Sequence, residues 1–256
     1  LLPNGRRIFN VAIRTIQLHQ GKAIYGVGGG ITWDSTWESE YREVHQKAAV
    51  LYRKQARFKL ITTGKISQKN LLFEEQHIER LRKASRYFAF PFDSENLKQK
   101  IEEECQACDA NQDYRLHISL DKSGEIEVDR QVLTALSPSF CQAKLCLQEA
   151  NLQQAFIYFK TTHRPHLSIG EQEIIYHNKS GELLETSIGN LVLKISGKLY
   201  TPPIRLGILP GIYRQLLLET GQVEERVLTL KDLARAEAIY GCNAVRGLYE
   251  LSVREN

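Results

Sequence analysis

The stretch Ala155-Phe156-Ile157-Tyr158-Phe159-Lys160-Thr161-Thr162-His163-Arg164 places Lys160 between an aromatic run and a polar run. The five residues before Lys160 are apolar or aromatic, which predicts a buried β-strand that ends at the lysine. Burial disfavours the ammonium form and lowers the pKa of a lysine, as a nucleophilic or proton-carrying amine requires near neutral pH. Lys160 is therefore a candidate Schiff-base amine. From this pattern alone, a solvated lysine at a strand end is the alternative.

Three segments after Lys160 add a second pattern. They are Gly181-Glu182-Leu183-Leu184-Glu185-Thr186-Ser187-Ile188-Gly189-Asn190-Leu191, then Thr201-Pro202-Pro203, and then Leu209-Pro210-Gly211-Ile212-Tyr213-Arg214. Glu185 follows the apolar pair Leu183-Leu184 and is predicted to lie in a buried strand, whereas Glu182 is predicted to lie in a turn. In this order, after a lysine, the segments resemble the fold-type IV pyridoxal 5'-phosphate (PLP) enzymes, the class IV aminotransferase superfamily. The resemblance covers about residues 58–252.

The resemblance implies that Lys160 holds the aldehyde of PLP and that Glu185 pairs with the ring nitrogen. A carboxylate there keeps the ring protonated, so that the ring can accept electrons. Asn190 follows Glu185 by five residues, as in the family's Glu-x-x-x-x-Asn motif, and is expected to orient this segment. A structural role in a turn is the alternative for Asn190. Thr63 resembles the strand threonine that bacterial lyases of this superfamily use in proton transfer, and a β-branched strand filler is its alternative.

Backbone N–H groups at a helix start commonly bind phosphate. Gly211 allows close approach just before an apolar helix, and Gly211, Ile212 and Tyr213 are the candidate contacts. The family often has a threonine where this chain has Tyr213, so only a hydroxyl contact there is in question. Asn243 and Ala244 resemble the second phosphate loop of the family.

The run His77-Ile78-Glu79-Arg80-Leu81 matches the family's His-x-x-Arg-Leu helix, whose arginine reaches the phosphate. Arg80 is therefore a candidate phosphate ligand; a solvated arginine on an amphipathic helix is the alternative. Arg164 and Arg246 are candidates for substrate carboxylates because of their charge, and solvated surface arginines are the alternative for both.

The run from Phe159 to Arg164 resembles the lyase branch of the superfamily. The reaction that this implies converts 4-amino-4-deoxychorismate to 4-aminobenzoate and pyruvate, a step in folate precursor synthesis. Lys160 would remove the proton at the amine-bearing carbon, and Thr63 would help to pass a proton to the departing group. A branched-chain or D-amino-acid aminotransferase is the alternative, because it would share every cofactor residue. A degenerate module that docks to a synthase without catalysis is a third hypothesis.

The first fifty residues carry a different resemblance. Val11-Ala12-Ile13-Arg14-Thr15, the run Gly28-Gly29-Gly30-Ile31, and the later Glu40-Tyr41-Arg42-Glu43 resemble the C-terminal end of chorismate-utilising enzymes, specifically the aminodeoxychorismate synthase large component. The rest of that catalytic domain is not in this sequence, so a working chorismate site is not expected here. The implied partners are an aminodeoxychorismate synthase and its glutamine amidotransferase.

Composition narrows the function classes. The net charge of +4 is spread along 256 residues, which suits a small anionic substrate and argues against nucleic acid. Apolar stretches are far shorter than the roughly 18 residues of a membrane span, and no leader opens the sequence, so we expect a cytoplasmic protein without a membrane partner. The five cysteines are expected to be reduced. Cys105 and Cys108 are expected to pack in a helix core, and no metal site is predicted.

The predicted fold class is α/β (α+β), with residues 1–54 as the synthase-like remnant, 57–148 as a small α/β domain and 149–256 as a larger PLP-binding domain. Apolar periodicity predicts helices over residues 35–54, 74–88, 95–108, 213–219 and 231–237. Strands are predicted over residues 9–15, 21–25, 58–63 and 114–120, the last opening a hairpin. By resemblance, PLP lies in the cleft between the two α/β domains of a homodimer.

Overall fold

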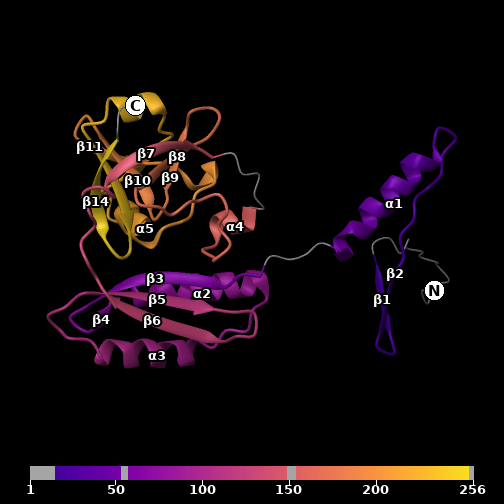
Figure 1. Cartoon of the computed structure of the whole chain (residues 1–256), viewed down its shortest axis with the longest axis horizontal. Helices are drawn as coiled ribbons and strands as arrows, with labels where there is room; N and C mark the ends of the chain where they lie inside the picture. Colours follow the sequence, from indigo (N-terminus) through magenta and orange to yellow (C-terminus); the bar gives the residue numbers. More distant parts are fainter. Residues whose placement is uncertain (1–14, 53–56, 149–153, 254–256) are drawn as a thin grey trace, which may run out of the picture. The chain divides into compact units, whose positions relative to one another are not determined.

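The computed structural model describes residues 15–52, 57–148 and 154–253. The chain divides into two compact units, Leu1–Ala56 and Arg57–Asn256. Figure 1 shows the helices and strands of both units.

The N-terminal unit contains a β-hairpin and one helix. Strands β1 (Ile16–His19) and β2 (Lys22–Tyr25) pair antiparallel around a two-residue turn in which Gln20 and Gly21 both have positive φ, as the twist of a tight hairpin requires. Helix α1 (Trp37–Tyr52) begins two residues later than predicted, and the last two residues of the predicted helix, 53 and 54, lie outside the described residues. The strand predicted over residues 9–15 falls almost wholly outside the described residues.

The larger unit begins with a four-stranded sheet in the order β4-β3-β5-β6. Helices α2 and α3 contact it. Asp93 caps α3 by accepting hydrogen bonds from the N–H groups of Glu95 and Asn96. The bounds are β3 (Leu60–Ser67), β4 (Asn70–Leu71), α2 (Glu74–Phe88), α3 (Ser94–Gln106), β5 (Tyr114–Leu120) and β6 (Ile126–Val132).

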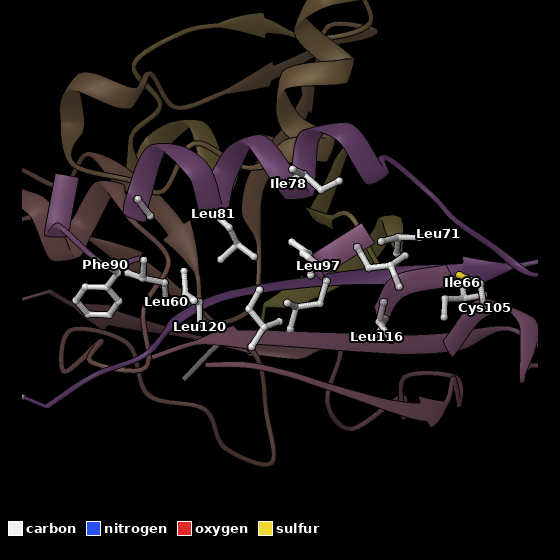
Figure 2. Packing of buried hydrophobic residues seen from close by; sticks show 14 of the residues in the cluster. Leu60, Ile66, Leu71, Ile78, Leu81, Phe90, Leu97, Cys105, Leu116 and Leu120 are labelled. Carbon is white, nitrogen blue, oxygen red and sulfur yellow. The ribbon is translucent and has the colours of Figure 1, made fainter. Parts of the chain in front are cut away.

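One face of this sheet and the two helices enclose a single apolar core (Figure 2). Alternate residues of β3 are buried, so Leu60 and Ile66 face the helices while Thr63 lies on the other face. Ile78 and Leu81 of α2 complete the core from above, and each is fully buried. Cys105 and Cys108 are buried and free, so the predicted core role of both is confirmed.

The second sheet has eight strands in the order β12-β11-β10-β13-β14-β7-β8-β9, with a further pairing between β9 and β10. That pairing joins Glu185 to Asn190 and closes six of the strands into a ring. The bounds are β7 (Gln142–Leu147), β8 (Ile174–His177), β9 (Leu183–Thr186), β10 (Asn190–Ile195), β11 (Lys198–Thr201), β12 (Glu224–Glu225), β13 (Ala238–Asn243) and β14 (Gly247–Val253).

Short helices accompany this closed sheet: α4 (Gln154–Tyr158), η1 (Ile204–Leu206), α5 (Ile212–Glu219) and α6 (Leu230–Ala234). The strand predicted immediately before Lys160 is wrong, because that segment forms α4. Phe159 N–H donates to the Ala155 carbonyl, and the rings of Phe156 and Phe159, three residues apart, both pack against Phe88. Aromatic packing on one helical face, rather than strand pairing, explains the apolar run.

The mixed fold of helices and sheets confirms the predicted α/β class. The four-stranded sheet uses residues between 60 and 132, and the eight-stranded sheet uses residues between 142 and 253. Because β7 pairs with β14 and β8, the chain passes from one sheet to the other between residues 132 and 142, before the predicted boundary at residues 148/149.

Candidate active site

Backbone pairing with β3 determines where Lys160 lies. Ile61 N–H donates to the Lys160 carbonyl at 2.9 Å, and Thr162 N–H donates to the Lys59 carbonyl at 2.9 Å. The Thr162 hydroxyl accepts from Lys59 N–H, also at 2.9 Å. Lys160 therefore lies beside the first residues of β3, although the segment before it is the short helix α4 and not a strand.

The Lys160 amine is surrounded by cations. Among the described residues its Nζ has no hydrogen-bond or ion-pair partner. Burial lowers the pKa of Lys160 well below its usual value, and Arg80, Arg164 and Arg115 lower it further, while Glu185 opposes the shift. The amine is thus biased toward its neutral, nucleophilic form, as the sequence predicted.

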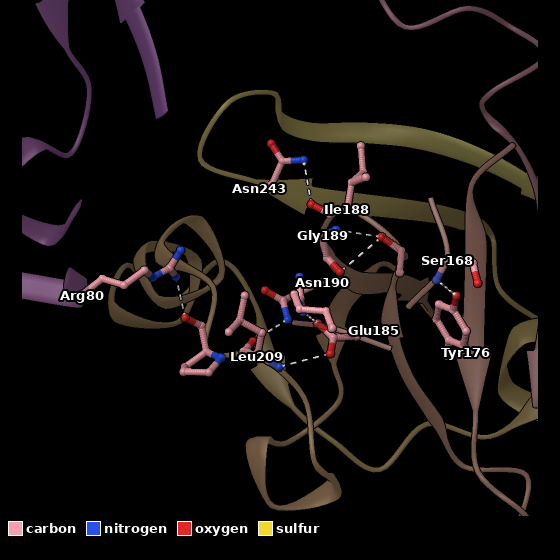
Figure 3. Close-up of polar contacts among 12 residues, drawn as sticks. Arg80, Ser168, Tyr176, Glu185, Ile188, Gly189, Asn190, Leu209 and Asn243 are labelled. Atoms are coloured by element: carbon pink, nitrogen blue, oxygen red, sulfur yellow. Dashed lines mark hydrogen bonds and ion pairs between the residues drawn. The ribbon is translucent and has the colours of Figure 1, made fainter. Parts of the chain in front are cut away.

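Glu185 lies at the point where the sheet closes, on β9 opposite Asn190. Its side chain is 2% exposed, with Oε2 3.6 Å from Arg164 Nη2. Oε1 accepts a hydrogen bond from Leu209 N–H at 3.4 Å (Figure 3). Burial raises the pKa of Glu185 to about 7, against the opposing effects of Arg164, Leu209 N–H and Lys160.

Asn190 and Arg80 hold the loop before α5 from two sides (Figure 3). Asn190 Nδ2 donates to the Leu209 carbonyl at 2.8 Å, and Arg80 Nη2 donates to the Pro210 carbonyl at 2.8 Å. A Cβ on Gly211 would lie 2.0 Å from Asn190 Oδ1, so a larger residue there would displace the Asn190 amide. Gly211 is the N-cap of α5, and the first backbone N–H groups of a helix have no partner within it.

Arg80 is positioned through its helix. Three residues earlier, His77 is buried and its Nδ1 lies 2.6 Å from the Thr62 hydroxyl on β3. Burial, Arg80 and Lys160 lower the pKa of His77 to about 3, so the ring is neutral and serves as a packed hydrogen-bonding anchor. Burial, with Arg164 nearby, lowers the pKa of Arg80 to about 10, so its guanidinium keeps its charge at neutral pH.

The second predicted anion loop connects β13 to β14. Asn243 Oδ1 accepts from Val245 N–H at 3.0 Å and from Arg246 N–H at 2.9 Å, and so shapes the turn after the buried Ala244. Tyr213 of α5 lies against this turn, since a Cβ on Gly247 would be 3.3 Å from its hydroxyl. The two predicted phosphate-binding segments, around Ile212 and Asn243, therefore lie side by side.

Arg246 is placed differently from Arg164. Its Nη1 donates to the Thr134 carbonyl, and its charged neighbours include Arg115. Arg164 instead forms its ion pair with Glu185. The two arginines expected to bind substrate carboxylates thus have different surroundings.

Thr63 lies on the sheet face opposite the helices. Its hydroxyl is 3.3 Å from Nδ1 of His117, the residue directly across from it on β5. Burial lowers the pKa of His117, with smaller effects from Arg115 and Lys160. Sequence reasoning missed His117 and Arg115, although the alternation of β5 places both on the face of Thr63.

The arrangement brings two cations, Arg80 and Arg164, and one buried carboxylate, Glu185, into electrostatic contact with the Lys160 amine. Such a site favours a small ligand with several negative charges and supplies both a neutral amine and a carboxyl group for proton transfer. Within residues 15–52, 57–148 and 154–253, no cluster of His, Cys, Asp or Glu has the composition to hold a metal ion. No helix in the same ranges is long and apolar enough to cross a membrane.

Comparisons with known proteins agree with the division of the chain into an N-terminal unit and a larger unit. The family model described as amino-transferase class IV matches residues 59–252, and the model described as chorismate binding enzyme matches residues 1–53. A curated relative, the aminodeoxychorismate lyase of Saccharomyces cerevisiae, is 30% identical over 126 residues, covering 39% of this chain and 34% of that protein. The chain spans about a third of the length of the curated relatives that it matches.

Solved structures show the same fold. A putative amino-acid aminotransferase from Mesorhizobium loti has a TM-score of 0.67 at 24% identity, covering 77% of this chain and 100% of that one. The PLP-bound form of a hypothetical aminotransferase from Mycobacterium tuberculosis has a TM-score of 0.63 at 17% identity, covering 76% and 81%. At these identities the likeness establishes the architecture alone.

Proposed function

Because the chain belongs to the class IV aminotransferase family, we propose that residues 57–256 form a PLP-dependent enzyme. The observation that carries the proposal is the Lys160 amine, which has no described hydrogen-bond partner and lies in electrostatic contact with Glu185, Arg80 and Arg164. A lysine far from other cations normally keeps its charge at neutral pH. Here the cationic surroundings favour a neutral amine instead.

The residues of this site fit PLP. Lys160 would hold its aldehyde, and Glu185 would accept a hydrogen bond from its ring nitrogen. Arg80 and the backbone N–H groups of Gly211, Ile212 and Tyr213 would bind its phosphate. Asn243 and Ala244 would contribute from the adjoining turn, and Asn190 would hold the Leu209 carbonyl and thereby the loop. When bound, PLP supplies an electron-accepting ring that stabilises negative charge on the substrate carbon.

We propose that the reaction is the conversion of 4-amino-4-deoxychorismate to 4-aminobenzoate and pyruvate. The curated relative from yeast is a lyase of that name, and the excess of cations suits a substrate with several carboxylates. An aminotransferase acting on branched-chain or D-amino acids is the second candidate, favoured by the fold match to a putative aminotransferase.

In the lyase, the neutral Lys160 amine takes the proton from the amine-bearing carbon of the substrate. Glu185 would pair with the ring nitrogen as a carboxylate. Thr63, hydrogen-bonded to His117, is placed to carry a proton toward the departing pyruvyl group. Substrate carboxylates would lie near Arg246 and Arg115, whose mutual repulsion an anion relieves.

Product analysis separates the two reactions. The purified protein, loaded with PLP, is given 4-amino-4-deoxychorismate without any keto-acid acceptor, and 4-aminobenzoate and pyruvate are quantified. Equal amounts of both products, abolished by Lys160→Ala, support the lyase. Activity that needs a keto acid and yields no pyruvate contradicts it and favours the aminotransferase.

We also propose that residues 1–53 associate this enzyme with an aminodeoxychorismate synthase and its glutamine amidotransferase, since these residues match the chorismate-binding model. A homodimer and a cytoplasmic location are further proposals, made from the family resemblance. Size-exclusion chromatography with light scattering, alone and with the synthase added, tests both kinds of association.

A further inference from the structure

Arg164 is buried without hydrogen-bond partners at two of its guanidinium nitrogens. Its side chain is 16% exposed, and within the described residues Nε and Nη2 donate to no acceptor. Burying unpartnered donors on a charged group is costly, so a favourable electrostatic contact is needed to hold the side chain there. Its ion pair with Glu185, 3.6 Å between Nη2 and Oε2, is that contact.

The charges around Arg164 identify Glu185 as its negative partner. Its other nearby groups are the guanidinium of Arg80, the amine of Lys160, the phenol of Tyr176 and the imidazole of His166. His166 is 5% exposed, with both ring nitrogens unpartnered among the described residues. In the described part of the chain, no carboxylate other than Glu185 forms an ion pair with Arg164.

The hydrogen-bonding capacity of Glu185 leaves room for one more donor. A carboxylate has about four acceptor positions on its two oxygens. Oε1 accepts from Leu209 N–H, and Oε2 faces Arg164. At least one further position is therefore free for the N–H of a ring nitrogen, without displacing either neighbour.

We propose that Arg164 is a positioning residue that holds Glu185 in its ionised form, so that the proton shared between Glu185 and the ring nitrogen of PLP stays on the ring. The inference rests on the PLP site proposed above. A fixed positive charge beside Oε2 favours the carboxylate over the carboxylic acid. A protonated ring is the stronger electron acceptor, so Arg164 acts on the chemistry through Glu185 and not as a ligand for a substrate carboxylate.

The ring nitrogen itself reports the outcome. Apo-protein is loaded with PLP labelled with ¹⁵N at the ring, and the ¹⁵N chemical shift is measured at neutral pH. The wild type, Arg164→Lys and the exposed control Arg205→Gln should all show a protonated ring. Arg164→Gln and Glu185→Gln should both move the shift toward unprotonated pyridine. Thermal unfolding verifies that each variant is folded, and Arg164→Met replaces Arg164→Gln if the latter does not fold.

Affinity for the cofactor gives a second, activity-independent readout. Arg164→Gln should weaken PLP binding about tenfold, the scale of one charge-assisted contact. A 1-deaza analogue of PLP, which lacks the ring nitrogen, should bind the wild type and Arg164→Gln alike.

The results separate this inference from the function on which it rests. A wild type that does not bind PLP contradicts the proposed function. A wild type that binds PLP with a protonated ring, while Arg164→Gln leaves the ring shift unchanged and raises only the KM for substrate, overturns the inference alone. Loss of ring protonation in Arg164→Lys would also overturn it, because that variant keeps the charge.

Discussion

Many apolar side chains are buried in the larger unit, whereas those of the N-terminal unit are mostly exposed. In residues 57–256, Leu81 and Ile118 are fully or almost fully buried within a continuous core. In residues 15–51 no side chain is buried, and Trp33 is fully exposed while Leu18 is 79% exposed. Within the described residues, only the larger unit therefore offers the low-dielectric surroundings that shift the pKa of a lysine or a glutamate. The N-terminal unit instead displays apolar surface, a property typical of interaction sites.

The largest expected effect on activity is that of replacing Lys160. Lys160→Ala should lower kcat by about 10³-fold or more, because it removes the proposed proton carrier. The fold should persist, because the Lys160 amine has no hydrogen-bond or ion-pair partner among the described residues that its removal would leave unpaired. Steady-state kinetics and thermal unfolding measure the two properties, with the exposed Lys122→Ala as the matched control. If Lys160→Ala retains most of the activity, the reaction does not require the Lys160 amine.

The difference in burial can be tested with two leucines. Leu81→Ala should lower the free energy of unfolding by about 2–5 kcal/mol, because it leaves a cavity in the core between α2 and the sheet. Leu18→Ala, in the N-terminal hairpin, should change it by less than about 0.5 kcal/mol. Urea denaturation measures both. Equal effects would mean that Leu18 is covered in solution.

The apo-protein should also reveal the buried carboxyl group through the pH dependence of its stability. Folded Glu185 keeps its proton up to about pH 7, whereas in the unfolded chain the group ionises near its ordinary pKa of 4.5. The folded state therefore binds more protons between these values, and stability falls as pH rises through this window. The side chain in Glu185→Gln cannot ionise. Between pH 4 and pH 8 its free energy of unfolding should therefore fall by up to about 3 kcal/mol less than that of the wild type. Urea denaturation measures the free energy of unfolding of both apo-proteins. If it depends on pH in the same way in both, the raised pKa assigned to Glu185 is contradicted.

The smallest expected effect comes from removing the N-terminal unit. Every candidate cofactor residue lies between residues 63 and 246, and the cores of the larger unit contain no residue before 58. A protein of residues 57–256 should therefore keep its PLP affinity and its unfolding midpoint. Spectroscopic titration and thermal unfolding measure these, while binding to a synthase should be lost. Loss of PLP binding on truncation would show that the two units are not independent.

Sequence patterns predicted the parts of the structure that depend on periodicity. Apolar spacing predicted helix α2 over residues 74–88 and the buried strand that contains Glu185, and it placed α3 at residues 95–108 where the structure has Ser94–Gln106. The run before Lys160 was misread because a short apolar segment fits either a strand or a helix, and the aromatic cluster around Phe88 decides between them.

Contacts between distant segments lay beyond sequence patterns. Nothing in the spacing indicates that Arg164 pairs with Glu185, or that Thr63 faces His117, because each pair depends on how separate strands are registered. The closure of the sheet at Glu185 and Asn190 likewise becomes visible only when β9 and β10 are paired in space.

The central claim is that Lys160, within its cationic surroundings, is the amine that holds PLP. Borohydride reduction of the PLP-loaded protein, followed by proteolysis and mass spectrometry, identifies the lysine that carries the cofactor. We predict one modified peptide, containing Lys160, and no modification in Lys160→Ala. A cofactor found on another lysine, or none retained by the wild type, would contradict the account.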